Sequence, residues 1–141
     1  EKRQSLYTEI KGMAVGRRIK LALKGGREVR GILIRDANKL IKRLVLRNPR
    51  MTDDEIVILA RNKSEETEFL DFISKRKDWM KSYQVRLALV TNPKTPFTIA
   101  LRIIATLLDR DLRQLSKSKN VPGMVTSAAK RLLFKRQAGD S

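Results

Sequence analysis

Residues 84–108 read QVRLALVTNPKTPFTIALRIIATLL, and the fold of this 141-residue chain is organised around them. The second half of the stretch, residues 97–108, holds a single charged side chain, Arg102. Apolar residues recur there at the i, i+3, i+4, i+7 spacing of one helical face, while Ile99 and Ile103 cover the opposite side. A helix that is apolar nearly all round must be buried on several sides, so this segment is predicted to be the central helix of the fold.

The central helix also has a predicted burial pattern. Leu101 and Ile104 belong to its main apolar face, and we expect both side chains to be nearly inaccessible. A Leu101 that faces solvent would show that the repeat described below is false. The Asn92-Pro93 pair is expected to end the preceding helix, because the residue before a proline is biased away from the helical conformation.

The composition narrows the classes of function. The chain has 32 Lys and Arg residues against 15 Asp and Glu, a net charge of +17, with no Cys and no His. These absences exclude a disulfide, a thiolate metal ligand and a histidine general base. Residues 1–50 carry fifteen basic and four acidic side chains, residues 51–80 five and eight, and residues 81–141 twelve and three. Such one-sided charge indicates a polyanionic partner, with a merely basic soluble protein as the alternative.

Targeting signals are absent from the sequence as it stands. No apolar run reaches the roughly 20 residues that a membrane-spanning helix needs, and no stretch resembles a signal peptide. A cytoplasmic location without a membrane span is therefore expected, which agrees with the lack of cysteine.

The chain is predicted to be all-α, with about eight to ten helices. Apolar residues keep helical rather than alternating spacing throughout. Amphipathic helices are expected over residues 14–24, 27–35 and 39–47, and a single helix over residues 79–91. Gly25-Gly26 is interpreted as a plain turn rather than an anion-binding nest, and no Gly-Lys-Ser/Thr follows that would make it a nucleotide-binding loop.

The positions of the acidic residues are explained by where the predicted helices begin. Thr52 and Glu55 are spaced as a capping box, and the acids from Asp53 onward lie in first helical turns, where negative charge complements the helix dipole. A metal site built from these carboxylates is the alternative, and we predict none.

Two passages of the chain resemble each other, LVLRNPRMT at residues 44–52 and ALVTNPKTP at residues 88–96. Each has an apolar helix end, an Asn-Pro turn, a basic residue and a threonine before the next helix, and the two asparagines lie 44 residues apart. Periods near 40 to 47 residues are typical of armadillo and HEAT-type arrays. Over residues 36–136 the chain resembles α-helical solenoids of the armadillo/HEAT or leucine-rich-repeat-variant kind. The phrases LVTNPKTP and KSKNVP are also similar to uncharacterised bacterial helical-repeat proteins.

This resemblance implies a short right-handed α-α superhelix formed by a single domain, residues 13–136. Its expected parts are a cap at 13–35 and units at about 36–77 and 78–136, flanked by a polar N-terminal extension at 1–12 and a frayed tail at 137–141. The two units depart from strict repetition, because the second holds an extra or longer helix.

Basic side chains form stripes on successive predicted helices without interleaved acids, with Lys24, Arg27 and Arg30 among them. Rows of Lys and Arg can follow a phosphate backbone, with affinity from counterion release, although a single stripe is ordinarily a solvated face. The predicted nucleic-acid-binding residues are Arg17, Lys20, Lys39, Lys42, Arg43, Arg47, Arg50 and Lys94, with Lys130, Arg131, Lys135 and Arg136 as a second patch.

Trp79 and Tyr83 lie one helical turn apart and are candidates for stacking a nucleobase, with a core anchor as the alternative. No catalytic residue, metal site or small-molecule cofactor is assigned. The sequence thus predicts a non-catalytic binding module for nucleic acid, either DNA or RNA. A scaffold that binds an acidic protein is the alternative, and the oligomeric state is left open.

Overall fold

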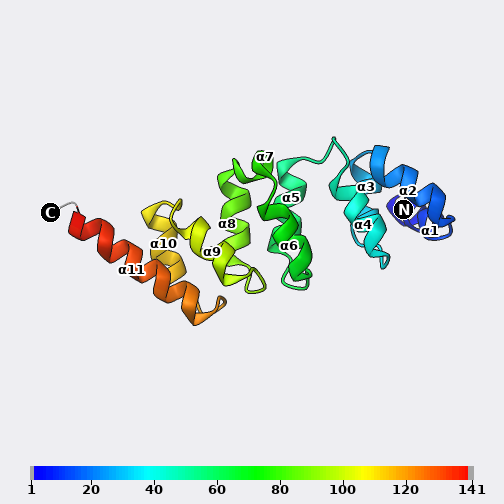
Figure 1. The fold of residues 1–141 in the computed structure, drawn as a ribbon. Coiled ribbons are helices and arrows are strands. Elements are labelled where there is room, and N and C mark those ends of the chain that lie inside the picture. Colours follow the sequence, from blue (N-terminus) through cyan, green and yellow to red (C-terminus); the bar gives the residue numbers. More distant parts are fainter. Residues whose placement is uncertain (1, 140–141) are drawn as a thin grey trace. The chain divides into compact units, whose positions relative to one another are not determined.

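The computed structural model describes residues 2–139, with Arg3 described by its backbone alone. It is all-α, as predicted: 71% of the structure is helix, and no strand occurs in the described residues. Eleven helices are found between Lys2 and Gly139 (Figure 1). The chain divides into two compact units, residues 1–55 (unit 1) and residues 56–141 (unit 2). The predicted repeat limits at 35/36 and 77/78 differ from this division. The superhelical arrangement stays a prediction.

Unit 1 is built on a small apolar core. It contains α1 (Lys2–Lys11), α2 (Val15–Lys24), α3 (Arg27–Leu33), α4 (Lys39–Leu46) and the first turn of α5 (Asp53–Arg61). α2 packs against α3 and α4, and α1 packs against α3. The core residues are Ile10, Ala22, Leu33, Ile41 and Val45. Ile10 is 1% exposed, so the segment predicted as an N-terminal extension belongs to the compact unit, because α1 places this one large apolar side chain in the core.

Side chains cap two helices of unit 1, and one of these caps was predicted above. The Asn38 side chain accepts a hydrogen bond from the N–H of Leu40 at the start of α4. Thr52 and Glu55 form the predicted capping box: Glu55 Oε2 accepts from the N–H of Thr52 at 2.8 Å, and Thr52 Oγ1 accepts from the N–H of Glu55 at 3.4 Å. These local signals fix where α4 and α5 begin.

Unit 2 contains the remainder of α5 and six further helices. These are α6 (Thr67–Ser74), α7 (Lys77–Met80), α8 (Tyr83–Thr91), α9 (Phe97–Ile104), α10 (Asp109–Ser116) and α11 (Gly123–Gly139). Consecutive helices from α6 to α9 pack in order, and α11 packs against both α9 and α10. The green-to-red part of Figure 1 shows these elements.

Three predicted boundaries in unit 2 are wrong. The single helix expected over residues 79–91 is two helices, because the Ser82 hydroxyl accepts from the N–H of Val85 and caps α8. The central helix ends at Ile104, followed by a turn in which the Thr106 hydroxyl donates to the carbonyl of Ile103 at 2.7 Å. α11 continues to Gly139 and takes in most of the predicted frayed tail, of which residues 140–141 lie outside the described part.

The predicted core face of α9 is also wrong in part. Ile104 is 2% exposed, as expected, but Leu101 is 46% exposed, and the core instead receives Ile99, Ala100 and Ile103. A helix that is apolar on all sides gives no sequence signal for which side is covered, and here the covered face is rotated away from Leu101. Its exposure is the outcome named in advance as evidence against the repeat, so the armadillo/HEAT resemblance has no support from this helix.

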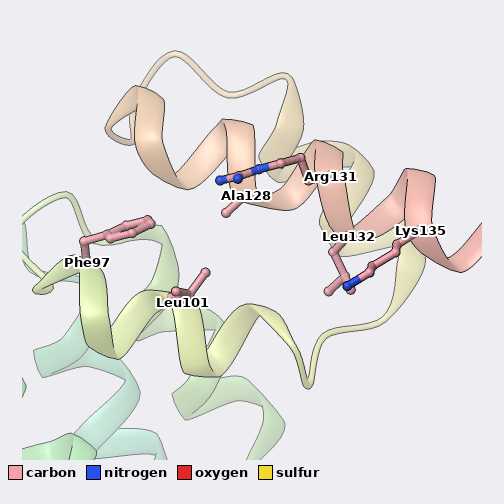
Figure 2. Close-up of a pocket in the computed structure, with 6 residues that line it drawn as sticks. All are labelled: Phe97, Leu101, Ala128, Arg131, Leu132 and Lys135. Atoms are coloured by element: carbon pink, nitrogen blue, oxygen red, sulfur yellow. The ribbon is translucent and has the colours of Figure 1, made fainter.

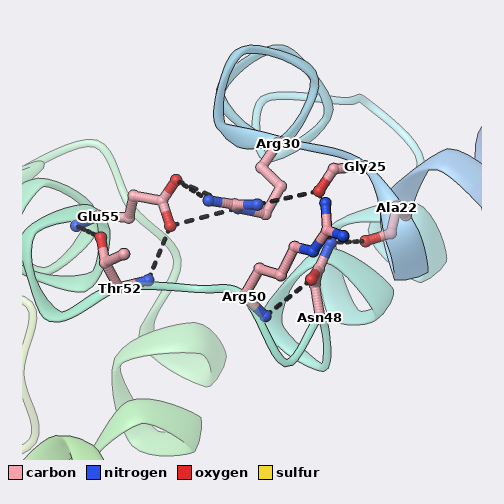
Figure 3. A network of polar contacts seen from close by, with 7 residues as sticks. All are labelled: Ala22, Gly25, Arg30, Asn48, Arg50, Thr52 and Glu55. Atoms are coloured by element: carbon pink, nitrogen blue, oxygen red, sulfur yellow. Dashed lines mark hydrogen bonds and ion pairs between the residues drawn. The ribbon is translucent and has the colours of Figure 1, made fainter.

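The two Asn-Pro turns have the same pattern of side-chain hydrogen bonds. In unit 1, the Asn48 amide donates to the carbonyls of Ala22 and Gly25, each at 3.0 Å, at the end of α2 (Figure 3). Asn48 Oδ1 accepts from the N–H of Arg50 at 2.9 Å. Asn48 is 3% exposed, so its amide satisfies carbonyls away from water, of which that of Gly25 also accepts from Arg30.

In unit 2, the Asn92 amide makes the matching contacts at the end of α5. It donates to the carbonyl of Ala60 at 2.7 Å and to that of Asn62 at 3.0 Å, and Oδ1 accepts from the N–H of Lys94 at 3.0 Å. Asn92 is also 3% exposed. We call this arrangement, in either unit, the Asn clamp: a buried amide that joins the end of a later helix to the carbonyls at the end of an earlier one.

A related contact, which we call the Arg clamp, lies a further 44 residues along the chain, at Arg136 inside α11. Its Nη1 donates to the carbonyl of Leu107 at 2.7 Å, and Nη2 donates to that of Ala105 at 3.2 Å, just beyond α9. Positions 48, 92 and 136 are thus equally spaced, and each donates to carbonyls of an earlier segment. Arg136 differs from the two asparagines because it lies inside a helix and is partly exposed. Sequence inspection found only the first two, because the third residue is an arginine that no proline follows.

Candidate polyanion-binding surface

The basic residues predicted on α2 and α4 are exposed in unit 1. On α2, Arg17 and Lys20 are one turn apart. On α4, Lys39 and Arg43 share a face, and Arg47 lies at its C-terminal end. Arg50 is also exposed, while Lys42 is half-buried. Because α2 packs against α4, these side chains come from two neighbouring helices of one compact unit.

Two other arginines of unit 1 are removed from this surface by carboxylates. Arg18 Nη1 lies 2.9 Å from Asp36 Oδ2. Arg30, predicted to lie on a basic stripe, is 4% exposed: its guanidinium pairs with Glu55 at 2.9 Å and donates to the carbonyl of Gly25 (Figure 3). A buried arginine is stable only with such partners, so Arg30 has a structural role and is not available to a ligand.

Three of the exposed basic residues of unit 1, Arg17, Lys20 and Arg47, have no carboxylate partner in the described part of the chain. Residues 1–55 hold fifteen basic and seven acidic side chains, and two of those acids are taken by Arg18 and Arg30. The positive charge of Arg17, Lys20 and Arg47 is therefore not neutralised by a described carboxylate, which is a condition for attracting a polyanion.

The second predicted patch lies in unit 2. Lys94, Lys130, Arg131 and Lys135 are exposed. Arg136 is not available in the same way, because its guanidinium clamps the turn after α9 and pairs with Asp109 at 2.8 Å. Its predicted role as a phosphate contact is therefore replaced by a structural one.

A shallow open groove between α9 and α11 joins part of this patch to apolar side chains. Phe97 and Leu101 on α9 point toward α11, and Ala128 and Leu132 lie on the facing side (Figure 2). Arg131 and Lys135 complete the lining from α11, and the lining contains no acidic residue. The sequence analysis missed this groove because it assigned Leu101 to the core.

The predicted stacking pair is not available for a nucleobase. Trp79 is 4% exposed, with the Arg76 guanidinium 4.1 Å from its ring centroid and the Phe72 ring 6.1 Å away. The Tyr83 hydroxyl donates to Asp111 Oδ2 and accepts from the N–H of Leu108. Both aromatic residues therefore anchor helices, which was the alternative stated from the sequence.

The ionisable groups show few perturbations. Burial, with the hydrogen bond to Asp111 as a second cause, raises the pKa of Tyr83 above its ordinary value. A hydrogen bond from Arg76 lowers the pKa of the exposed Asp78. Both shifts follow from structural contacts. Within residues 2–139 no group of three or more acidic side chains is placed to hold a metal ion, and no helix there has the length and hydrophobicity to span a membrane.

Comparison with protein-family models, with curated proteins and with solved structures found no significant match to this chain.

Proposed function

We propose that this chain is a non-catalytic helical module that binds nucleic acid, or another polyanion, through the basic side chains of α2 and α4. The observation that carries the proposal is the set of exposed, unpaired cations Arg17 and Lys20 on α2 and Arg47 directly after α4, the helix that packs against α2. Lys39, Arg43 and Arg50 are further exposed basic residues of α4 and the turn after it. Contacts of this kind position a protein on a phosphate backbone without reading its sequence.

The non-catalytic part of the proposal is supported by the side chains available. The chain lacks His and Cys, which are the commonest general base and an intrinsically strong nucleophile. The perturbed tyrosine, Tyr83, is held by Asp111 and by a backbone amide, so its pKa has a structural explanation.

The test is fluorescence anisotropy with labelled duplex DNA, duplex RNA and single-stranded probes over a range of salt concentrations. The triple variant Arg17→Glu, Lys20→Glu, Arg47→Glu should bind more weakly. Its slope of log K against log[salt] should fall by about 2 to 3, because each lost phosphate contact removes about 0.9 from the slope for B-DNA.

A matched control has the same change in net charge elsewhere. The variant Lys63→Glu, Lys77→Glu, Lys81→Glu reverses three exposed lysines of unit 2 and should keep most of the wild-type slope. Equal losses in the two variants would indicate attraction to net charge alone. Binding by the wild type weaker than about 0.1 mM at low salt would overturn the proposal, since even non-specific binders do better.

The second candidate function is a scaffold for an acidic protein. One specific observation favours it, the α9–α11 groove, which combines apolar and cationic side chains. A pull-down repeated after nuclease treatment separates the two functions, because a protein partner survives digestion and a nucleic-acid-mediated one does not.

A further inference from the structure

We propose that the groove between α9 and α11 is a docking site for a short amphipathic helix with acidic residues on one flank of its apolar face. This site lies in unit 2 and does not rest on nucleic-acid binding by unit 1. The apolar floor of the groove and its charged wall both point to such a partner.

The floor of the groove is apolar, with Leu101 exposed, Phe97 and Leu132 half-buried and Ala128 buried. Leu101 is 46% exposed although the rest of α9 is among the most apolar sequence in the chain. Phe97 lies one turn before it on the same helix face, and Leu132 and Ala128 lie one turn apart on α11 (Figure 2). Covering these side chains removes apolar area from water, which favours a partner with its own apolar stripe.

The charged wall of the groove comes from α11 alone. Arg131 and Lys135 are spaced i and i+4, so they are neighbours on the helix surface, and no described carboxylate pairs with either. A helix that carries acidic residues at i and i+4 presents its charges at the same spacing. The complementary partner therefore has one apolar face and acidic residues beside it.

The apolar floor also separates this ligand from nucleic acid. A phosphate backbone satisfies Arg131 and Lys135 but leaves Phe97 and Leu101 in water, because it has no apolar face to cover them. An acidic amphipathic helix satisfies both parts of the lining.

The experiment uses the full chain and a fluorescein-labelled designed peptide with leucines along one helical face and glutamates at i and i+4 beside it. Anisotropy should show binding that Leu101→Asp and Arg131→Glu each weaken by about tenfold or more, as expected for central contacts of an interface. Two exposed positions outside the lining supply matched controls, Ile58→Asp for the apolar change and Arg113→Glu for the charge. Neither control should change the affinity by more than about twofold.

Three outcomes would overturn the proposal: no binding by the wild type, equal binding of a peptide with the same composition in scrambled order, or unchanged affinity in both groove variants. Circular dichroism of each variant checks that the helices persist. Nucleic-acid binding measured on the same variants keeps the two proposals apart. Leu101→Asp should leave it intact, whereas the α2–α4 triple variant should lose it and still bind the peptide.

Discussion

In unit 2, Asn92 and Arg136 both donate hydrogen bonds to carbonyls of an earlier segment, the first from an amide and the second from a guanidinium. Asn92 is 3% exposed and donates its amide to two carbonyls at the end of α5. The Arg136 side chain is 31% exposed, reaches two carbonyls after α9, and adds an ion pair with Asp109. A short neutral amide suits a position sealed from water, because burying a cation there would require a charged partner. At the partly exposed position a longer cation can bind the same kind of acceptor. Asn92 and Arg136 are alike in donating hydrogen bonds to carbonyls of an earlier segment. Their different burial explains why one is a neutral amide and the other a cation.

The largest expected effect is from removal of the buried clamp. Asn92→Ala leaves the buried carbonyl of Ala60 without its side-chain donor. It also removes the partly buried bonds to the N–H of Lys94 and to the carbonyl of Asn62, which still accepts from the N–H of Glu65. A buried unsatisfied group costs about 1 to 3 kcal/mol and the other two bonds add less, so we expect a total loss of about 2 to 4 kcal/mol. Urea denaturation followed by circular dichroism measures it, and Asn48→Ala should fall in the same range. A loss below about 1 kcal/mol in both variants would contradict the assigned role.

The next test concerns Gly25, whose carbonyl accepts a hydrogen bond from the Asn48 amide. A Cβ at Gly25 would lie 2.5 Å from the Leu21 carbonyl oxygen and 2.8 Å from Val29 Cγ1. Gly25→Ala should therefore destabilise the chain by about 1 to 3 kcal/mol, since backbone must move to make room. Gly31→Ala is the control: it lies inside α3 with nothing within 4 Å of the added Cβ, so it should stabilise by about 0.5 to 1 kcal/mol. Equal effects of the two substitutions in denaturant titrations would show that the close approach at Gly25 does not matter.

The exposed clamp should matter less than the buried one. Arg136→Ala removes bonds that water can partly replace, so we expect a loss of about 1 kcal/mol. Arg136→Lys keeps the charge but removes the planar fork that reaches two carbonyls, and it should recover little of the loss. Thermal denaturation at low and high salt separates the contributions. Full recovery by lysine, with a strong salt dependence, would indicate that the ion pair with Asp109 is the main contribution.

The smallest effect is expected at Tyr83, whose hydroxyl joins α8 to α10 through Asp111. Because burial and this hydrogen bond raise the pKa of Tyr83 above 10.0, the folded state favours the protonated phenol. The stabilisation is fully present below the pKa of the unfolded tyrosine and is lost as the pH rises through the higher folded value. Tyr83→Phe should reduce the pH dependence of unfolding above pH 10, by less than about 1 kcal/mol in stability. An unchanged alkaline profile in this variant would contradict the assignment.

The sequence by itself determined the all-α class and many of the helix starts. Helical spacing of apolar residues, the Thr52–Glu55 capping box and the Asn38 cap are local signals that involve residues within one or two turns. The two Asn-Pro turns were recognisable for the same reason. Such signals need no knowledge of the rest of the chain.

Only the tertiary structure decided which side chains are covered. Leu101 and Ile104 look alike in a helix that is apolar all round, and the packing of the neighbouring helices exposes one and buries the other. From the sequence, Arg30 looks like a surface cation. In the structure it pairs with Glu55, 25 residues later in the chain. From the sequence, Arg136 looks like part of a basic patch. In the structure its guanidinium donates to carbonyls about 30 residues earlier in the chain. Burial depends on contacts between distant segments, which periodicity along one helix does not specify.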